Sequence, residues 1–237
     1  MSAFAESLGT AVALVLDADP VLLHTVGLSL SVSTSACVAA AGVGLGGGAW
    51  LAVASFPGRR VLVAVLNTLL ALPSVVVGLI VYLLLSRSGP LGAWGILFTP
   101  GAMVIAQTFL VLPLVAALAR QLVADSLRDG GDQLRSMGAG ALTGALLMLV
   151  HERWAVATIL LTAFGRAVSE VGAVMIVGGN IDGVTRVITT TIALETSKGN
   201  LPLALALGLV LLAIVGVVNA AIMLAQRAQG AGLAGAR

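Results

Sequence analysis

The stretch AVATILLTAFGRAVSEVGAVMIVGG, residues 155–179, decides how this sequence folds. It is long enough to cross a bilayer, and apart from Arg166 and Glu170 it carries no charge. An ionised side chain in hydrocarbon is costly, so such groups usually pair with one another or face an aqueous path. A separation of four residues places both on one face of a continuous helix. The stretch therefore predicts a transmembrane helix with an internal ion pair.

Two interpretations of this pair remain open. In the first, Arg166 and Glu170 form a structural salt bridge that holds helices together. In the second, they form a polar gate beside a translocation path, with the hydroxyl of Ser169 next to them and Gly172 allowing another backbone to approach.

The composition of the whole chain agrees with a membrane protein. Hydrophobic residues make up 59% of the 237 residues and charged residues 9%, whereas a soluble domain carries about 25% charged residues. We expect an all-α, polytopic protein with about five transmembrane helices of about 20 residues each. The expected spans are residues 22–45, 61–85, 96–119, 155–179 and 201–225.

The remaining segments complete the domain organisation. Residues 1–20 are predicted to hold an interfacial helix, because 4–16 is apolar but too short to span. The transmembrane domain covers 21–226, and 227–237 forms a tail. Pro73 and Pro113 predict kinks in the second and third spans, and GxxxG-like spacings at 42/46 and 44/48 favour close helix packing in the first.

The distribution of arginine and lysine predicts the orientation. With the N-terminus outside and the C-terminus in the cytoplasm, three basic residues lie outside: Arg87, Arg186 and Lys198. Eight lie inside: Arg59, Arg60, Arg120, Arg128, Arg135, Arg153, Arg227 and Arg237. Cytoplasmic loops are enriched in these residues, so this orientation is favoured, in a cell (inner or plasma) membrane.

This orientation leaves a long cytoplasmic segment, residues 120–154, between the third and fourth spans. Gly130 and Gly131 are predicted to break it, Asp132 to cap a short helix over 133–137, and Gly138 to end that helix. Residues 136–150 are predicted to pack near the membrane surface without spanning it. A loop of this length with its own helices is usually functional.

The sequence offers little for catalysis. Lys198 is the only lysine and is not part of a phosphate-binding loop, so any ATP and Mg²⁺ would be bound by another subunit. His24, His151 and the single Cys37 lack metal-ligand spacing. We therefore expect no enzyme activity, no metal and no cofactor on this chain.

Two regions resemble the permeases of binding-protein-dependent ABC importers. FGRAVSEVGAVMIVGGNIDG (164–183) looks like the F-x-R-A-x-x-E-x-G segment of the molybdate, tungstate and sulfate permeases, and TRVITTTIALETSKGN (185–200) is similar to the tungstate-type branch. The segment 120–154 resembles the coupling loop, whose pattern is E-A-A, three residues and G. Asp132, Gln133 and Leu134 stand at E-A-A, and Gly138, followed by Ala139, at the glycine.

This resemblance implies a type I (MetI-like) permease fold and a homodimer that carries tungstate, or molybdate, into the cytoplasm. A cytoplasmic ATPase pair would dock at Asp132, Gln133, Leu134, Gly138 and Ala139, and an extracytoplasmic binding protein would deliver the oxyanion. Two other readings stay open: a permease for a different oxyanion such as sulfate, or an ion-coupled secondary transporter that uses the Arg166–Glu170 pair.

Overall fold

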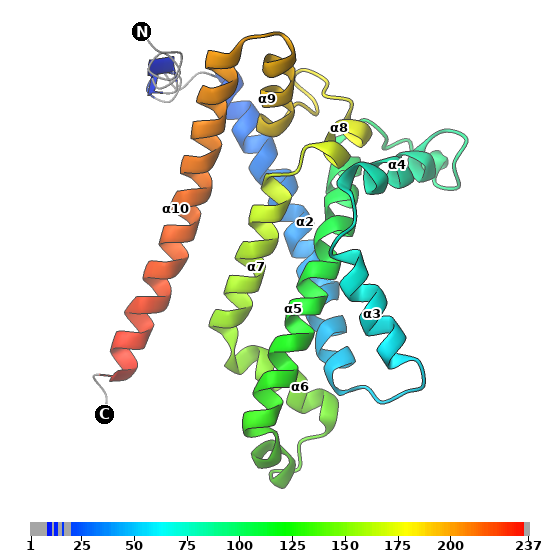
Figure 1. Ribbon diagram of the computed structural model, residues 1–237, viewed down its shortest axis with the longest axis vertical. Helices are drawn as coiled ribbons and strands as arrows, with labels where there is room; N and C mark the ends of the chain where they lie inside the picture. Colours follow the sequence, from blue (N-terminus) through cyan, green and yellow to red (C-terminus); the bar gives the residue numbers. More distant parts are fainter. Residues whose placement is uncertain (1–8, 11, 14–15, 17–19, 235–237) are drawn as a thin grey trace. The chain divides into compact units, whose positions relative to one another are not determined.

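The computed structural model describes residues 9–10, 12–13, 16 and 20–234, and in these residues all regular secondary structure is helical. Figure 1 shows the arrangement. The helices are α2 (Pro20–Val53), α3 (Arg59–Leu69), α4 (Ser74–Leu85), a short 3₁₀ helix η1 (Gly92–Trp94), α5 (Pro100–Ser136), α6 (Ala141–His151), α7 (Arg153–Val168), α8 (Gly172–Gly178), α9 (Ile188–Ser197) and α10 (Leu201–Ala234). This confirms the all-α prediction.

The helices divide into two compact units, Ser31–Gly179 and the pair of segments Met1–Leu30 and Asn180–Arg237. In the first unit α5 is central and packs against α3, α4, α6, α7 and α8. Within this unit, α6 lies at the C-terminal end of α5, and α4 and α8 lie near its other end (Figure 1). The core between α2, α5 and α7 is built from small and branched side chains, including Ala40, Val111 and Ala163.

In the part of the chain that the structure describes, three helices are long and apolar enough to cross a membrane: α2, α5 and α10. Two further pairs of helices are bent, α3 with α4 and α6 with α7, and the candidate spans number up to five if each pair counts as one span. The predicted span 61–85 is thus two helices that meet at 103°, and the pair α6–α7 bends by 78°. Pro73, directly before α4, has an extended backbone, and a proline also disfavours a helical conformation in the residue before it. These two effects account for the first bend, which at 103° is far sharper than the predicted kink.

Glycines of α2 allow its close approach to α5. A Cβ added at Gly44 would lie 2.9 Å from Cγ1 of Val115, and one at Gly48 would lie 2.5 Å from the carbonyl oxygen of Ala116. Cβ atoms at Gly42 and Gly46 would meet nothing within 4 Å. The small-residue packing predicted for this span is therefore confirmed for the 44/48 pair only.

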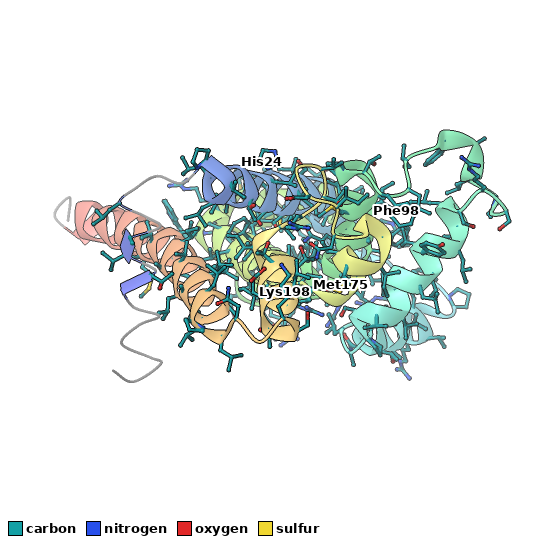
Figure 2. All side chains as sticks on the ribbon, turned by 90° about the horizontal axis from the view of Figure 1, so that it is seen from above. His24, Phe98, Met175 and Lys198 are labelled. Carbon is teal, nitrogen blue, oxygen red and sulfur yellow. The ribbon has the colours of Figure 1, made fainter. Side chains whose placement is uncertain are left out.

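The helices of the other unit are held together by contacts that α9 makes. Its core joins Ile188 to Leu22 of α2 and Leu207 of α10. The hydroxyl of Ser29 accepts a hydrogen bond from the backbone N–H of Ile188 at 2.9 Å and so caps the start of α9. At the other end of α9, the ammonium of Lys198 (labelled in Figure 2) donates to the carboxylate of Glu195 at 2.8 Å, and Asn200 donates to it at 3.1 Å.

Two predictions concern the chain ends. Most of the segment 4–16, predicted as an interfacial helix, lies outside the described residues. The predicted tail 227–237 is helical as far as Ala234, because α10 continues through it, and 235–237 lie outside the described residues.

Candidate functional site: a broken span and the turn that follows α5

The predicted span 155–179 is interrupted at its charged residues. α7 ends at Val168, Ser169 is its C-cap, and α8 begins only at Gly172. Arg166 thus lies in the last turn of α7, whereas Glu170 lies beyond the end of that helix. The prediction of one continuous helix was wrong, although the predicted ion pair is present. Nη1 of Arg166 donates to Oε2 of Glu170 at 2.9 Å.

The carboxylate of Glu170 explains why the chain can break here. Its Oε1 accepts a hydrogen bond from the backbone N–H of Ala173 at 3.1 Å, so it satisfies one of the unpaired donors at the start of α8. On the other side of the break, the Ser169 hydroxyl donates to the carbonyl of Arg166 at 3.2 Å. A helix end needs such partners, because its terminal N–H and carbonyl groups have none within the helix.

The two partners of the ion pair differ in burial. The side chain of Glu170 is 3% exposed, and that of Arg166 is 43% exposed. Within the described residues, the only hydrogen bond of the Arg166 side chain is the one to Glu170. The carboxylate is therefore committed to internal contacts, whereas the guanidinium has donors that face away from it and could bind an anion.

Gly172 brings this break into contact with the break between α3 and α4. A Cβ at Gly172 would lie 2.9 Å from Cγ2 of Val75 and 3.0 Å from Oγ of Ser74, at the start of α4. A Cβ at Gly78 would lie 2.7 Å from Cα of Ala173. The break between α7 and α8 thus lies against the break between α3 and α4.

A strained turn just before α5 is hydrogen-bonded to α8. Phe98, labelled in Figure 2, has a positive φ of 61°, and its backbone N–H donates to the carbonyl of Val177 in α8 at 3.0 Å. Positive φ is uncommon for a bulky residue, so the surrounding structure must hold this conformation. The hydrogen bond ties the end of α8 to the segment that leads into α5.

The second candidate region is the C-terminal end of α5. The predicted break at Gly130–Gly131 and the separate helix over 133–137 are wrong, because α5 continues through them to Ser136. Glycine in a helix costs about 1 kcal/mol relative to alanine. Here the helix packs on α6, and Gly131 is buried. The prediction that Gly138 ends the helix is confirmed.

Gly138 ends α5 in a Schellman motif. Its φ is +83°, its N–H donates to the carbonyl of Arg135 at 3.0 Å, and the N–H of Ala139 donates to the carbonyl of Leu134 at 3.0 Å. Leu134 packs toward α6, since its Cδ1 lies 3.7 Å from where a Cβ of Gly144 would be. Asp132 and Gln133 are exposed. The predicted coupling residues are thus brought together in one turn.

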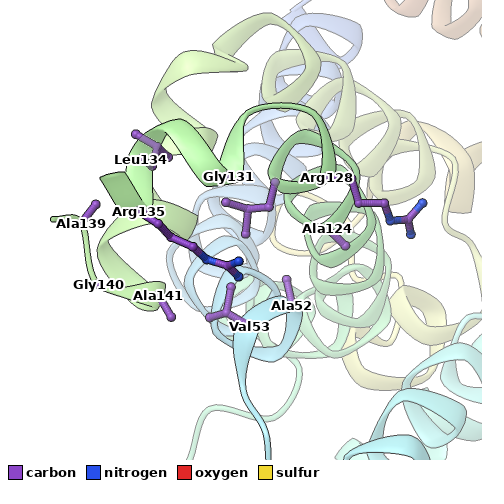
Figure 3. A pocket seen from close by; sticks show the side chains of 12 residues that line it. Ala52, Val53, Ala124, Arg128, Gly131, Leu134, Arg135, Ala139, Gly140 and Ala141 are labelled. Carbon is purple, nitrogen blue, oxygen red and sulfur yellow. The ribbon is translucent and has the colours of Figure 1, made fainter. Parts of the chain in front are cut away.

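Clefts lie on both sides of this α5–α6 hairpin. One, of about 400 Å³, is lined by the ends of α2 and α5 and the start of α6, with Arg128 and Arg135 on its wall (Figure 3). These arginines pair with Asp125 and Asp132 at 3.3 and 3.4 Å, in exposed ion pairs that stabilise little. The other cleft, of about 560 Å³, is lined by residues that include Gln133, Met137 and His151. The turn at Gly138 is therefore a protruding, partly polar surface.

Comparison with known proteins places this architecture among membrane permeases. The chain is 42% identical over 226 residues to the tungstate uptake system permease protein TupB of Peptoclostridium acidaminophilum, a match that covers 94% of this chain and 97% of that protein. It is 46% identical over 170 residues to a probable anion ABC transporter permease protein of Haloferax volcanii, covering 70% and 73% of the two chains. No family model matches the chain.

A more distant relative is named for sulfate transport. The sulfate transport system permease protein CysW of Escherichia coli is 32% identical over 182 residues, 71% of this chain and 60% of its own length. The chain belongs to the family of anion ABC transporter permeases, in its tungstate-type branch. It is a multi-pass membrane subunit of a transport system.

One residue of this region was missed by the sequence analysis. Gln107 of α5 is buried, and its side chain reaches the end of α7. The available signal was a carboxamide, next to Thr108, in the largely apolar stretch 101–119, and it resembles any tolerated polar residue in a span.

Proposed function

We propose that this chain is the membrane-spanning subunit of an ABC importer that carries tungstate into the cytoplasm. The observation that carries the proposal is the 42% identity to a tungstate uptake permease along nearly the full length of both chains. Molybdate is the next candidate, since a putative molybdenum transport permease of Bacillus subtilis is 31% identical over 167 residues.

The partners follow from the proposed class. A cytoplasmic ATPase would bind ATP and Mg²⁺ and supply the energy, an extracytoplasmic binding protein would deliver the anion, and two copies of this chain would form the path. The N-terminus would lie outside and the C-terminus in the cytoplasm. The bias of eight basic residues to three supports this orientation.

The gate of the path would lie at the break between α7 and α8. Arg166 would offer its outward donors to the anion, Glu170 would fix the guanidinium by the 2.9 Å ion pair, and Ser169 would add a hydroxyl. Gly172 would keep the gate joined to α4, because it leaves no room for a side chain. The half-exposed guanidinium supports this role over a purely structural ion pair.

The ATPase would dock on the turn after α5. Asp132 and Gln133 would present polar groups, Leu134 would fix the turn to α6, and Gly138 and Ala139 would form the Schellman turn itself. A protruding, rigid turn at the end of a long helix supports this role, since it can transmit rigid-body motion to the span.

Uptake in cells that lack their own high-affinity systems tests the function. The cells would express this chain with its binding protein and ATPase, and a matched strain would carry an ATPase inactivated in its nucleotide site. We expect tungstate uptake that requires the active ATPase and that excess molybdate reduces only weakly. Uptake that is equal in both strains would contradict the ABC importer, and sulfate uptake in place of tungstate would contradict the substrate.

A further inference from the structure

Gln107 is a polar residue kept in an apolar part of α5. Its residue is 4% exposed, and Met103 and Val111, one turn away on either side, are fully buried. Its Nε2 donates to the carbonyl of Ala167 at 2.9 Å, and its Oε1 is buried without a hydrogen-bond partner within the described residues. Since burying half of a carboxamide unpaired is unfavourable, packing alone does not account for this side chain.

The hydrogen bond reaches the end of α7, where backbone carbonyls lose their helical partners. Most hydrogen bonds to the carbonyls of this last turn are local. The N–H of Ser169 donates to the carbonyl of Gly165, and the N–H of Glu170 donates to the carbonyl of Ala167. Within the described residues, Gln107 makes the only hydrogen bond from another helix to these carbonyls. Ala167 directly follows Arg166, so this bond fixes the turn that carries the guanidinium.

The same helix also carries the turn at Gly138. No break interrupts α5 between Gln107 and Ser136, although Pro113 lies within it. A displacement of α5 would therefore reach the α7–α8 break through Gln107, provided that its hydrogen bond to Ala167 holds.

We propose that Gln107 is a positioning residue of the transport cycle, which couples α5 to the broken span and sets the orientation of Arg166. The proposal rests on the function proposed above. Gln107 acts through the carbonyl of Ala167 and does not itself contact the anion.

The first test replaces Gln107 by methionine, which keeps its length and flexibility but cannot donate. Proteoliposomes would contain this chain with its ATPase and binding protein, and tungstate transported per ATP hydrolysed would be measured. We expect this ratio to fall about three- to twentyfold in Gln107→Met, the range that the loss of one interhelical hydrogen bond in a membrane implies. The matched control is Thr108→Val, since the Thr108 hydroxyl donates to Val104 of its own helix, at 2.7 Å. It should keep the ratio.

The second test does not depend on transport. With Cys37 replaced by alanine, Ser169→Cys places a thiol at the exposed C-cap of α7, and its reaction rate with a charged, water-soluble thiol reagent is measured. Loss of the Gln107 bond should loosen this turn and change the rate by a similar factor, about three- to twentyfold. An unchanged rate in Gln107→Met would overturn the positioning role.

These two measurements distinguish a failure of the proposed transport function from a failure of the role proposed for Gln107. If the unsubstituted chain transports no oxyanion with ATP, the proposed function fails, and the labelling rate still decides the role of Gln107. If Gln107→Met does not reach the membrane, Gln107→Asn, which keeps the amide but is one methylene shorter, undergoes the same labelling. An altered rate in Gln107→Asn supports the role, and an unaltered one overturns it.

Discussion

At the residue scale, removing Arg166 and removing Glu170 should affect the stability of the protein differently. The sequence alone predicts that losing Glu170 is worse than losing both charges, because it would strand an unpaired arginine in the membrane. The side chain of Glu170 is 3% exposed and that of Arg166 is 43% exposed, so the deeply buried charge is that of the carboxylate. Removing Arg166 would take from the buried carboxylate the guanidinium that lies 2.9 Å from it.

We therefore predict that Arg166→Leu destabilises the protein by about 1.5–3 kcal/mol, the contribution of one hydrogen bond to a charged group, whereas Glu170→Gln costs less. Glutamine keeps an oxygen that can accept from Ala173. Thermal unfolding of the purified protein in detergent would measure both variants. The double variant Arg166→Leu/Glu170→Gln should recover part of the loss. Equal stability of Arg166→Leu and Glu170→Gln would contradict the asymmetry.

A second residue-scale prediction concerns Glu195, in α9. The hydrogen bond from Lys198 holds the pKa of Glu195 below its ordinary value of 4.5. A carboxylate with a lowered pKa contributes stability above the unfolded value, and this contribution is lost as the pH falls through the folded value. The turn that includes Asn200, whose N–H donates to the carbonyl of Glu195, should thus open below about pH 4.5.

Hydrogen-exchange protection of the Asn200 amide, corrected for the intrinsic exchange rate, would measure this opening. Glu195→Gln retains a hydrogen-bonding oxygen but does not titrate, so its protection should not depend on pH in this range. Protection that stays constant on acidification in the unsubstituted chain would count against the prediction.

At the element scale, substitutions at Gly138, in the turn after α5, are limited by the backbone conformation and not by the room available for a side chain. A Cβ at Gly138 would meet nothing within 4 Å, yet its φ is +83°. The left-handed conformation costs a residue with a Cβ about 1–2 kcal/mol. Gly138→Ala should therefore be as harmful as a bulkier residue, and Gly138→Asn should be tolerated better.

We predict that Gly138→Ala reaches the membrane normally but lowers tungstate transport per ATP hydrolysed. Gly140→Ala is the matched control, because Gly140 lies in the same turn with a φ of −66° and equally open surroundings. The ratio is measured in proteoliposomes that contain the ATPase and the binding protein. If both alanine variants behave alike, the left-handed turn has no special role.

The elements also explain how much the sequence could predict. The long apolar helices α2, α5 and α10 follow from hydrophobicity, and the turn at Gly138 follows from glycine chemistry. The break at Ser169–Val171 could not be predicted, because it has no proline and depends on Glu170, Ser169 and Gln107 satisfying the backbone groups that it exposes. Conversely, Gly130–Gly131 suggested a break that packing against α6 prevents.

At the scale of the whole molecule, the orientation in the membrane is the prediction to test. Ser88, after α4, and Ser136, at the end of α5, are both exposed. In a chain with Cys37 replaced by alanine, Ser88→Cys should react with a membrane-impermeant thiol reagent in intact cells. Ser136→Cys should react only after permeabilisation. The reverse pattern would place the N-terminus in the cytoplasm.

The length of α5 has a mechanical consequence. With 37 residues it is about 55 Å long, well over the hydrocarbon thickness of about 30 Å, so it extends beyond the membrane. Pro113 lies about 9 Å from Gln107 along the helix and about 37 Å from Gly138. If α5 pivots at Pro113, its two arms differ about fourfold in length, and a swing of about 4 Å at Gly138 becomes a shift of about 1 Å at Gln107. Such a lever would convert a coarse movement outside the membrane into a fine adjustment within it.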